Sequence, residues 1–282
     1  MAVDECVRGV VELTRPVNAI VAGILTFTGA FVALGSGVVS AVEPTVVATV
    51  VTVLATGAGN AINDYFDREV DRINNPERPL PRGSVAPRTA LLFSALLFAV
   101  AGGLSLALPL VAIAIAITNI TILLVYTPIL KESPGLGNAA VAYLGGSAFL
   151  FGGAAVGDLV APGILFVLAA LATFSREVIK DVEDLSGDRE NDLKTLPIAI
   201  GKQRALGSAA ILLCFMVALT PLPYVLETLG SPYLVLVVPA NLVMLYSAYV
   251  SFDNPTVGQS FLKYGTFLTA AAFIAGRAAT VL

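Results

Sequence analysis

Two rows of oxygen-bearing side chains occur at the same spacing in separate parts of the chain. The first row is Asn60, Asp64, Asp67 and Asp71, and the second is Glu177, Asp181, Asp184 and Asp188. Both follow the interval 4, 3, 4, which places the members of a row on one face of an α-helix. Gly187 precedes the last carboxylate, so we expect it to end the second helix and to leave Asp188 on a loop. Each segment therefore predicts a helix that presents a line of oxygen ligands.

These rows have a structural explanation and a chemical one. Carboxylates at exposed helix ends commonly pair with a basic residue one turn away, and Arg68, Arg72 and Lys180 are placed for this. The repeated spacing favours chemistry, because stacked carboxylates near a membrane repel each other and need a partner. Mg²⁺ binds one or two carboxylates together with substrate phosphate oxygens, so the rows predict metal ions that grip a diphosphate. The expected metal ligands are Asn60, Asp64, Asp67, Asp71, Asp181, Asp184 and Asp188, of which Asp64, Asp67, Asp181 and Asp184 are the catalytic candidates.

Basic side chains near both rows are candidates for substrate binding. The loop "RPLPRG" after the first row is stiffened by proline and carries two arginines, whose N–H groups bind phosphate in pairs. A single arginine is equally well explained as a charge that sets membrane orientation. The expected substrate-binding residues are Arg15, Asn18, Arg78, Arg82, Tyr126, Lys131, Arg176 and Lys180.

The composition predicts that the acidic rows lie at the edge of a membrane. Of 282 residues, 57% are hydrophobic and 13% are charged, and the mean hydropathy is +0.87. Soluble domains carry about 25% charged residues, so the solvent expected here is lipid. The chain has no histidine, and Cys6 and Cys214 lack the spacing of a metal site. Catalysis by histidine is therefore excluded, and carboxylates and basic groups remain for the chemistry.

Apolar windows of about 20 residues, long enough to cross a hydrocarbon core of ~30 Å, recur along the chain. We expect an all-α polytopic membrane protein in which residues 1–282 form a single membrane-embedded domain. Nine spans are predicted, at residues 16–37, 44–66, 88–108, 110–128, 137–156, 161–180, 204–224, 232–250 and 264–282. Almost no loop separates the third span from the fourth, which leaves open that they form one bent region.

The distribution of basic residues predicts the orientation of these spans. When alternate loops are assigned to opposite sides, 15 of the 16 lysines and arginines fall on one side and Arg277 alone falls on the other. Cytoplasmic loops carry an excess of positive charge. The N-terminus and both acidic rows are therefore expected in the cytoplasm, and the C-terminus outside.

The two acidic segments resemble the aspartate-rich motifs of the UbiA superfamily of intramembrane prenyltransferases. The segment "NDYFDREVDRINNPERPLPRG" is similar to the first motif, and "KDVEDLSGDRENDLKTLPIAIG" is similar to the second. The motifs stand in the expected order and separation, after an "RP" near the start, and the resemblance covers essentially the whole chain. It implies nine helices around a central cavity, a lateral opening to lipid, and a cytoplasmic cap made by the loops after spans two and six.

The resemblance also implies a reaction. Mg²⁺ would bridge the two motifs and a prenyl diphosphate donor, while Arg78, Lys131 and Tyr126 match positions that bind diphosphate and shield an allylic cation. The second motif is most similar to that of archaeal members, which transfer a geranylgeranyl group to the glycerol hydroxyl of geranylgeranylglyceryl phosphate. The expected partners are a prenyl diphosphate, a lipid-like phosphorylated acceptor and membrane lipid, with no nucleic acid and with protein partners unknown. Arg15 is the residue expected to bind the acceptor phosphate.

Three other functions fit parts of the pattern. The acceptor of the same family chemistry is alternatively an aromatic quinone precursor. A cation-coupled transporter also uses carboxylates within a membrane, although here they gather at one face and are surrounded by arginine. A CDP-alcohol phosphotransferase is a third Mg²⁺-dependent membrane enzyme, but its aspartate signature is missing and six spans would be expected.

Overall fold

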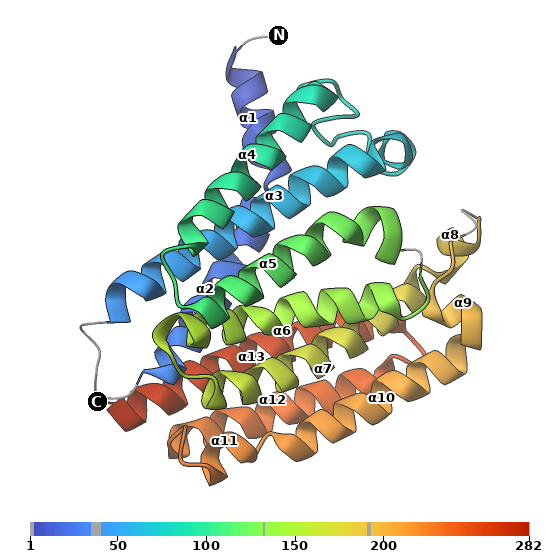
Figure 1. The fold of residues 1–282 in the computed structure, drawn as a ribbon. Coiled ribbons are helices and arrows are strands. Elements are labelled where there is room, and N and C mark those ends of the chain that lie inside the picture. Colours follow the sequence, from blue (N-terminus) through green and yellow to red (C-terminus); the bar gives the residue numbers. More distant parts are fainter. Residues whose placement is uncertain (1–2, 35–40, 132, 191–192, 282) are drawn as a thin grey trace.

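The computed structural model describes residues 3–34, 41–131, 133–190 and 193–281, and within these ranges it contains helices and turns but no strand (Figure 1). The described residues form nine long helices. They are α2 (Pro16–Ala33), α3 (Val42–Asn74), α4 (Pro87–Ser105), α5 (Leu110–Val125), α6 (Leu136–Val156), α7 (Val160–Glu183), α10 (Lys202–Leu219), α12 (Ser231–Val250) and α13 (Pro255–Val281). The all-α prediction is confirmed.

Eight helices within the described ranges are long and apolar enough to cross a membrane, and the chain is a multi-pass membrane protein. The helix α13 corresponds to the ninth predicted span but is not among these eight. It begins at Pro255, nine residues before the predicted start, and packs mainly against α12. The third and fourth spans are separate helices, α4 and α5. The predicted span ends at 37 and 282 lie outside the described residues.

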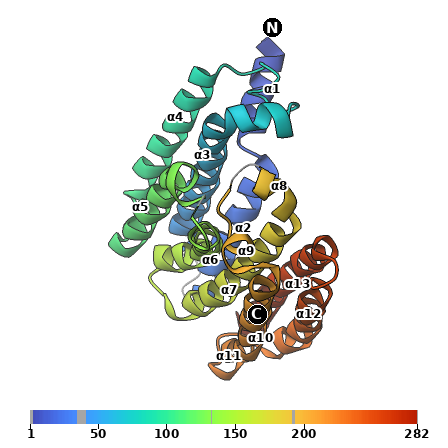
Figure 2. The ribbon, with the colours of Figure 1, turned by 90° about the vertical axis from the view of Figure 1, so that its right-hand side faces the viewer.

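Within the described ranges, five shorter helical segments were not predicted as separate elements, and four of them are too brief to show an apolar period. They are α1 (Val3–Leu13), the π-helix η2 (Tyr126–Leu130), α8 (Leu185–Glu190), α9 (Leu196–Ile200) and α11 (Leu222–Val225). The helix α1 is amphipathic, with Leu13 fully buried and Val7 and Val11 exposed. Figure 1 shows α8, α9 and the end of α3 at the same end of the bundle. Figure 2 looks onto this end, where α8 and α9 lie over α7 and beside α2.

The helices pack in neighbouring pairs, and the described residues form three hydrophobic cores, of which the smallest lies among α1, α3, α4 and the loop before α4. The largest core lies among α7, α10, α12 and α13 and includes Leu165, Leu213, Met244 and Phe273. A smaller core joins α3, α5 and α6. In the region where α2, α3, α5, α6 and α7 approach one another, packing is incomplete and leaves the cavities described below.

The crossing of α2 and α6 depends on two glycines. A Cβ atom at Gly29 would collide with the backbone of Phe149, and one at Gly152 would collide with the carbonyl oxygen of Thr26. Each glycine therefore allows the other helix's backbone to approach, as small residues do between membrane helices. Since α6 lines both cavities, this crossing fixes one wall of the site.

We expect Gly152→Val to destabilise the protein by about 1–3 kcal/mol or more, because overpacking at a backbone contact forces the helices apart. Thermal unfolding in detergent measures this as a lower Tm. The control is Gly102→Val on α4, where nothing lies within 4 Å of the added Cβ. Equal Tm values for the two variants would contradict the close α2–α6 contact.

Candidate functional site

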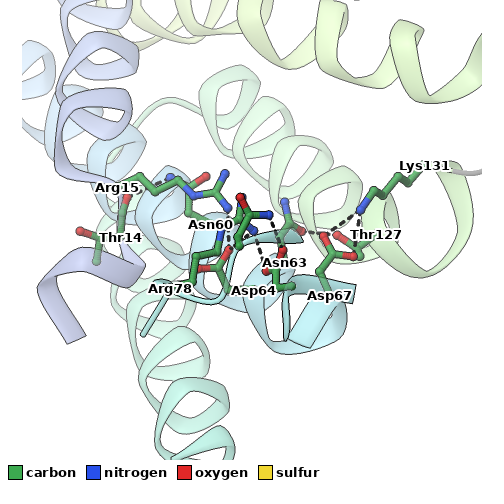
Figure 3. Close-up of polar contacts among 11 residues, drawn as sticks. Thr14, Arg15, Asn60, Asn63, Asp64, Asp67, Arg78, Thr127 and Lys131 are labelled. Atoms are coloured by element: carbon green, nitrogen blue, oxygen red, sulfur yellow. Dashed lines mark hydrogen bonds and ion pairs between the residues drawn. The ribbon is translucent and has the colours of Figure 1, made fainter. Parts of the chain in front are cut away.

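The first row lies on the last four turns of α3, and two of its carboxylates are neutralised by arginines (Figure 3). Asp64 is buried, and Arg15 Nη2 lies 2.5 Å from its Oδ1. Arg78, on the loop after α3, lies between the two carboxylates, with Nη1 2.6 Å from Asp71 Oδ2 and 3.5 Å from Asp64 Oδ1. Asp71 also accepts a hydrogen bond from Asn75. These ion pairs join three segments that are separate in the sequence, namely the start of α2, the end of α3 and the "RPLPRG" loop.

Arg15 is held in an uncommon backbone conformation. Its φ is 46° and its ψ is 69°, in the left-handed region that non-glycine residues seldom occupy. The residue directly precedes Pro16, which starts α2. Strained residues of this kind cluster at functional sites, where surrounding contacts must maintain them. The Arg15–Asp64 ion pair is such a contact.

Asp67 faces a different partner, which a π-helical turn brings to it. Lys131 Nζ donates to both carboxylate oxygens of Asp67, at 2.9 and 2.8 Å. The backbone N–H of Lys131 bonds to the carbonyl of Tyr126, five residues earlier, so η2 is one wide turn at the end of α5. Lys131 and Tyr126 both line one cavity. Thr127 of the same turn donates to Asn63 of α3. Single π-helical turns are rare in proteins overall, and those that occur are often found at functional sites.

The second row lines a polar cavity of about 160 Å³ at the end of α7. Its charged walls are Glu177, Lys180, Asp181, Asp184, Asp188 and Lys131. Asn138 of α6 donates to Asp181 Oδ2 at 2.7 Å. The helix ends at Glu183, four residues before Gly187, and Asp188 lies on α8. The prediction that Asp188 lies on a loop was therefore wrong, because the chain restarts as a short helix.

The charges of this cavity fit a divalent cation. Among the described residues, four carboxylates line it against two lysines, an excess of two negative charges. Burial raises the pKa of Asp184, an effect that Lys180 opposes and Glu183 adds to, and burial together with Asp184 raises the pKa of Asp188. A bound cation would offset the cost of burying these negative charges. No three acidic or cysteine side chains of the described residues are close enough to hold a metal alone, as is usual where Mg²⁺ shares its ligands with a phosphate.

A larger cavity of about 400 Å³ continues from the polar one into the helix bundle. Its head carries Asn60, Asn63, Arg176 and Glu177, and its body is lined by apolar or small side chains that include Val51, Ala116, Ile120, Leu144, Ala148 and Phe151. Tyr126, Val141 and Glu177 line both cavities. A molecule with a charged head and a long hydrocarbon chain fits this arrangement.

The remaining candidates lie at different places. Asn18 is exposed and lines the larger cavity, and Arg176 lines it beside Glu177. Lys180 lines the polar cavity. Asn60 lines the larger cavity and donates to the Thr14 carbonyl.

Among the described residues, Arg82 lines neither cavity. Its Nη2 is 2.5 Å from Glu12 Oε2 on α1, and it also bonds to Ser84. The hydrogen bond from Arg82, followed by that from Arg8, lowers the pKa of Glu12. The described role of Arg82 is thus to hold α1 against the loop.

Several site residues were missing from the predicted set. Asn138 of α6 contacts Asp181 from another segment, and Thr127 of η2 donates to Asn63, the neighbour of Asp64 on α3, and no local spacing marks these residues. Glu177 was part of the repeated interval but was not assigned a role. Its position at the start of the second row was the available signal.

Paired acidic helix ends, basic counter-charges and an apolar cavity beneath them define an intramembrane prenyltransferase. The family model described as "UbiA prenyltransferase family" matches residues 22–275, and the chain belongs to that family. The earlier resemblance is confirmed.

Relatives extend this similarity over nearly the full length. The chain is 56% identical over 278 residues to digeranylgeranylglyceryl phosphate synthase of Natronomonas pharaonis, covering 98% of this chain and 99% of that one. It is 55% identical over 273 residues to the protein of that name in Halobacterium salinarum, covering 97% and 98%. A solved structure from a study of "Digeranylgeranylglyceryl phosphate synthase in membranes" is similar with a TM-score of 0.85 and 34% identity, covering 97% and 99%.

Proposed function

We propose that this chain transfers a geranylgeranyl group from geranylgeranyl diphosphate to the free glycerol hydroxyl of geranylgeranylglyceryl phosphate. The product carries the second ether bond of an archaeal membrane lipid. The observation that carries the proposal is the junction of a charged cavity with an apolar one, where Tyr126 and Glu177 line both. The full-length identity to synthases of this name supports the choice of substrates.

The two cavities divide the donor between them. The diphosphate belongs in the polar cavity, where Lys131 and Lys180 are available to its oxygens. The isoprenoid chain belongs in the larger cavity, whose apolar walls exclude water from the carbon that reacts. Tyr126 stands where the two meet, so its ring is placed to face positive charge on the allylic carbon.

Magnesium fits the oxygen donors of both rows. Asp64, Asp67 and Asp71 on α3, with Asn60, and Asp181, Asp184 and Asp188 near the end of α7 would hold it. Bound Mg²⁺ supplies Lewis-acid stabilisation of the charge that develops on the departing diphosphate. Arg78 and Lys131 act on the same charge, since each already pairs with a carboxylate of the first row.

The orientation follows from the charge distribution. The N-terminus, both acidic rows and the polar cavity face the cytoplasm in this proposal, and the C-terminus lies outside, with residues 1–282 as one membrane-embedded domain. A diphosphate made in the cytoplasm then meets the site directly. Cysteine labelling of intact cells at position 86, which is exposed in the loop before α4, and at position 158, between α6 and α7, would measure this orientation.

The test of the proposed function is a transfer assay in detergent with radiolabelled geranylgeranyl diphosphate. Geranylgeranylglyceryl phosphate and 4-hydroxybenzoate are offered together as acceptors, with Mg²⁺ or with EDTA. We expect a diether product that requires Mg²⁺. Prenylated hydroxybenzoate would overturn the acceptor and keep the chemistry, whereas transfer to neither would favour the transporter alternative.

We expect Arg15→Ala to raise the KM for the phosphorylated acceptor about tenfold, and the KM for the donor much less. The reason is that Arg15 lies 37% exposed at the edge of the site, where its guanidinium can exchange Asp64 for a phosphate. Steady-state kinetics with each substrate varied separately measures both constants. Arg88→Ala, on α4, is the control. An equal effect of Arg15→Ala on both substrates would refute the assignment.

A further inference from the structure

We infer that Glu177 binds the acceptor hydroxyl and accepts its proton, an assignment that rests on the proposed function. In the reaction the C–O bond of the allylic diphosphate breaks and its electron pair leaves with diphosphate. The acceptor oxygen forms the new ether bond to the allylic carbon, and its proton passes to a Glu177 carboxylate oxygen. The products are the diether lipid, diphosphate and a protonated carboxyl, so atoms and charge balance.

The position of Glu177 is the first argument. Among the described residues, three line both the polar and the apolar cavity, namely Tyr126, Val141 and Glu177. Of these, Glu177 alone carries a group that accepts a proton at neutral pH. The reacting carbon joins the diphosphate to the hydrocarbon chain, so it must lie where the two cavities meet. Glu177 therefore faces the point where the hydroxyl attacks.

The surroundings of Glu177 are the second argument. Its side chain is 15% exposed, and Arg176 Nη1 lies 3.1 Å from its Oε1. The other carboxylates of the site are engaged differently. Asp64, Asp67 and Asp71 pair with loop or helix-end cations, and Asp181 accepts from Asn138. Glu177 lies one turn deeper than Asp181 on α7, toward the apolar channel.

Arg176 supplies the third argument. Its Nε is buried, and within the described part of the chain it has no hydrogen-bond partner. An unsatisfied buried donor is uncommon in a folded protein. The head of the larger cavity, which Arg176 and Glu177 both line, thus offers one donor and one acceptor. A glycerol hydroxyl with its neighbouring oxygens matches that pair.

The test compares Glu177→Gln and Glu177→Asp with wild type in three measurements. These are diether formation, diphosphate release without acceptor, and the Mg²⁺ concentration for half-maximal rate. We expect Glu177→Gln to lower diether formation by at least ~10²-fold, the usual contribution of a general base. Diphosphate release and the Mg²⁺ requirement should stay within about threefold. Glu177→Asp, which keeps the carboxylate, should restore part of the transfer.

The control is Glu183→Gln, which removes a carboxylate from α7 that lines neither cavity. Size-exclusion profiles and Tm values establish that each variant is folded. Wild-type transfer by Glu177→Gln would overturn the inference, as would a parallel rise in its Mg²⁺ requirement, which marks a metal ligand. Absence of diether formation by the wild-type protein would instead overturn the proposed function.

Discussion

Asp64→Asn is expected to abolish prenyl transfer, by about 10³-fold or more, while leaving the protein folded. Asp64 is buried, and its Oδ1 forms ion pairs with Arg15 Nη2 at 2.5 Å and Arg78 Nη1 at 3.5 Å. Asparagine keeps the shape and one hydrogen-bond acceptor, so these arginines retain a partner, but it removes the charge that a hard cation requires. The variant therefore loses the stabilisation of the charge on the leaving diphosphate in the transition state. Each ~1.4 kcal/mol added to the activation free energy lowers the rate tenfold.

The measurement is transfer rate at saturating substrates across a range of Mg²⁺ concentrations, with Tm as the folding check. Asp253→Asn, at an exposed carboxylate between α12 and α13, is the matched control and should behave as wild type. Asp181→Asn should resemble Asp64→Asn if both rows serve one metal centre. Wild-type activity in either variant would refute the role given to its row.

Ala116→Phe is expected to change which donor the protein prefers. Ala116 lies on α5, is 4% exposed and lines the larger cavity ten residues before Tyr126. At 1.5 Å per residue the two are about 15 Å apart along the helix, so Ala116 marks the far part of the channel. A phenyl ring there shortens the space for an isoprenoid chain. We expect the ratio of kcat/KM for geranyl over geranylgeranyl diphosphate to rise at least tenfold, the scale on which pockets discriminate chain length.

Ala114→Phe is the control, because Ala114 is exposed on the opposite face of α5. Competition between two radiolabelled donors, with products separated by chain length, measures the ratio directly. An unchanged ratio in a folded Ala116→Phe variant would place the isoprenoid chain elsewhere. A loss of both donors with lower Tm would instead report overpacking against Phe151, which shares the same core.

Much of the helical architecture was predictable because lipid imposes a strong constraint on sequence. Segments without water must satisfy their backbone groups internally, so long apolar windows become helices. The window that gave span two ended at residue 66, whereas α3 continues to Asn74. Its last turns are polar and are stabilised by contacts such as Arg78–Asp71, which hydropathy does not detect. The start of α13 at Pro255 was not predicted either, because its first turns are also polar.

The sequence predicted the two acidic rows of the candidate site, but it did not predict the contacts that their side chains make. The 4, 3, 4 interval correctly placed the first row on one helix, whereas the second row leaves α7 at Asp184 and continues on α8 with Asp188. The interval also did not reveal that Asp67 faces away from the partners of Asp64. That division depends on η2, where one wide turn brings Lys131 to α3. The role of Asn138 and the separation of the cavities likewise arise from packing between distant segments.

The ion pairs of the first row have a consequence for the order in which ligands arrive. Arg15, Arg78 and Lys131 now satisfy Asp64, Asp71 and Asp67. A diphosphate competes for Arg78 and Lys131, and as it takes them it releases Asp71 and Asp67, the carboxylates that a divalent ion requires. Each ligand thus removes an obstacle to the other. By thermodynamic linkage, the factor by which the donor tightens Mg²⁺ binding equals the factor by which Mg²⁺ tightens donor binding. Salt-bridge exchange therefore couples donor and Mg²⁺ binding as one cooperative equilibrium, and the same salt bridges keep the first row neutralised between turnovers.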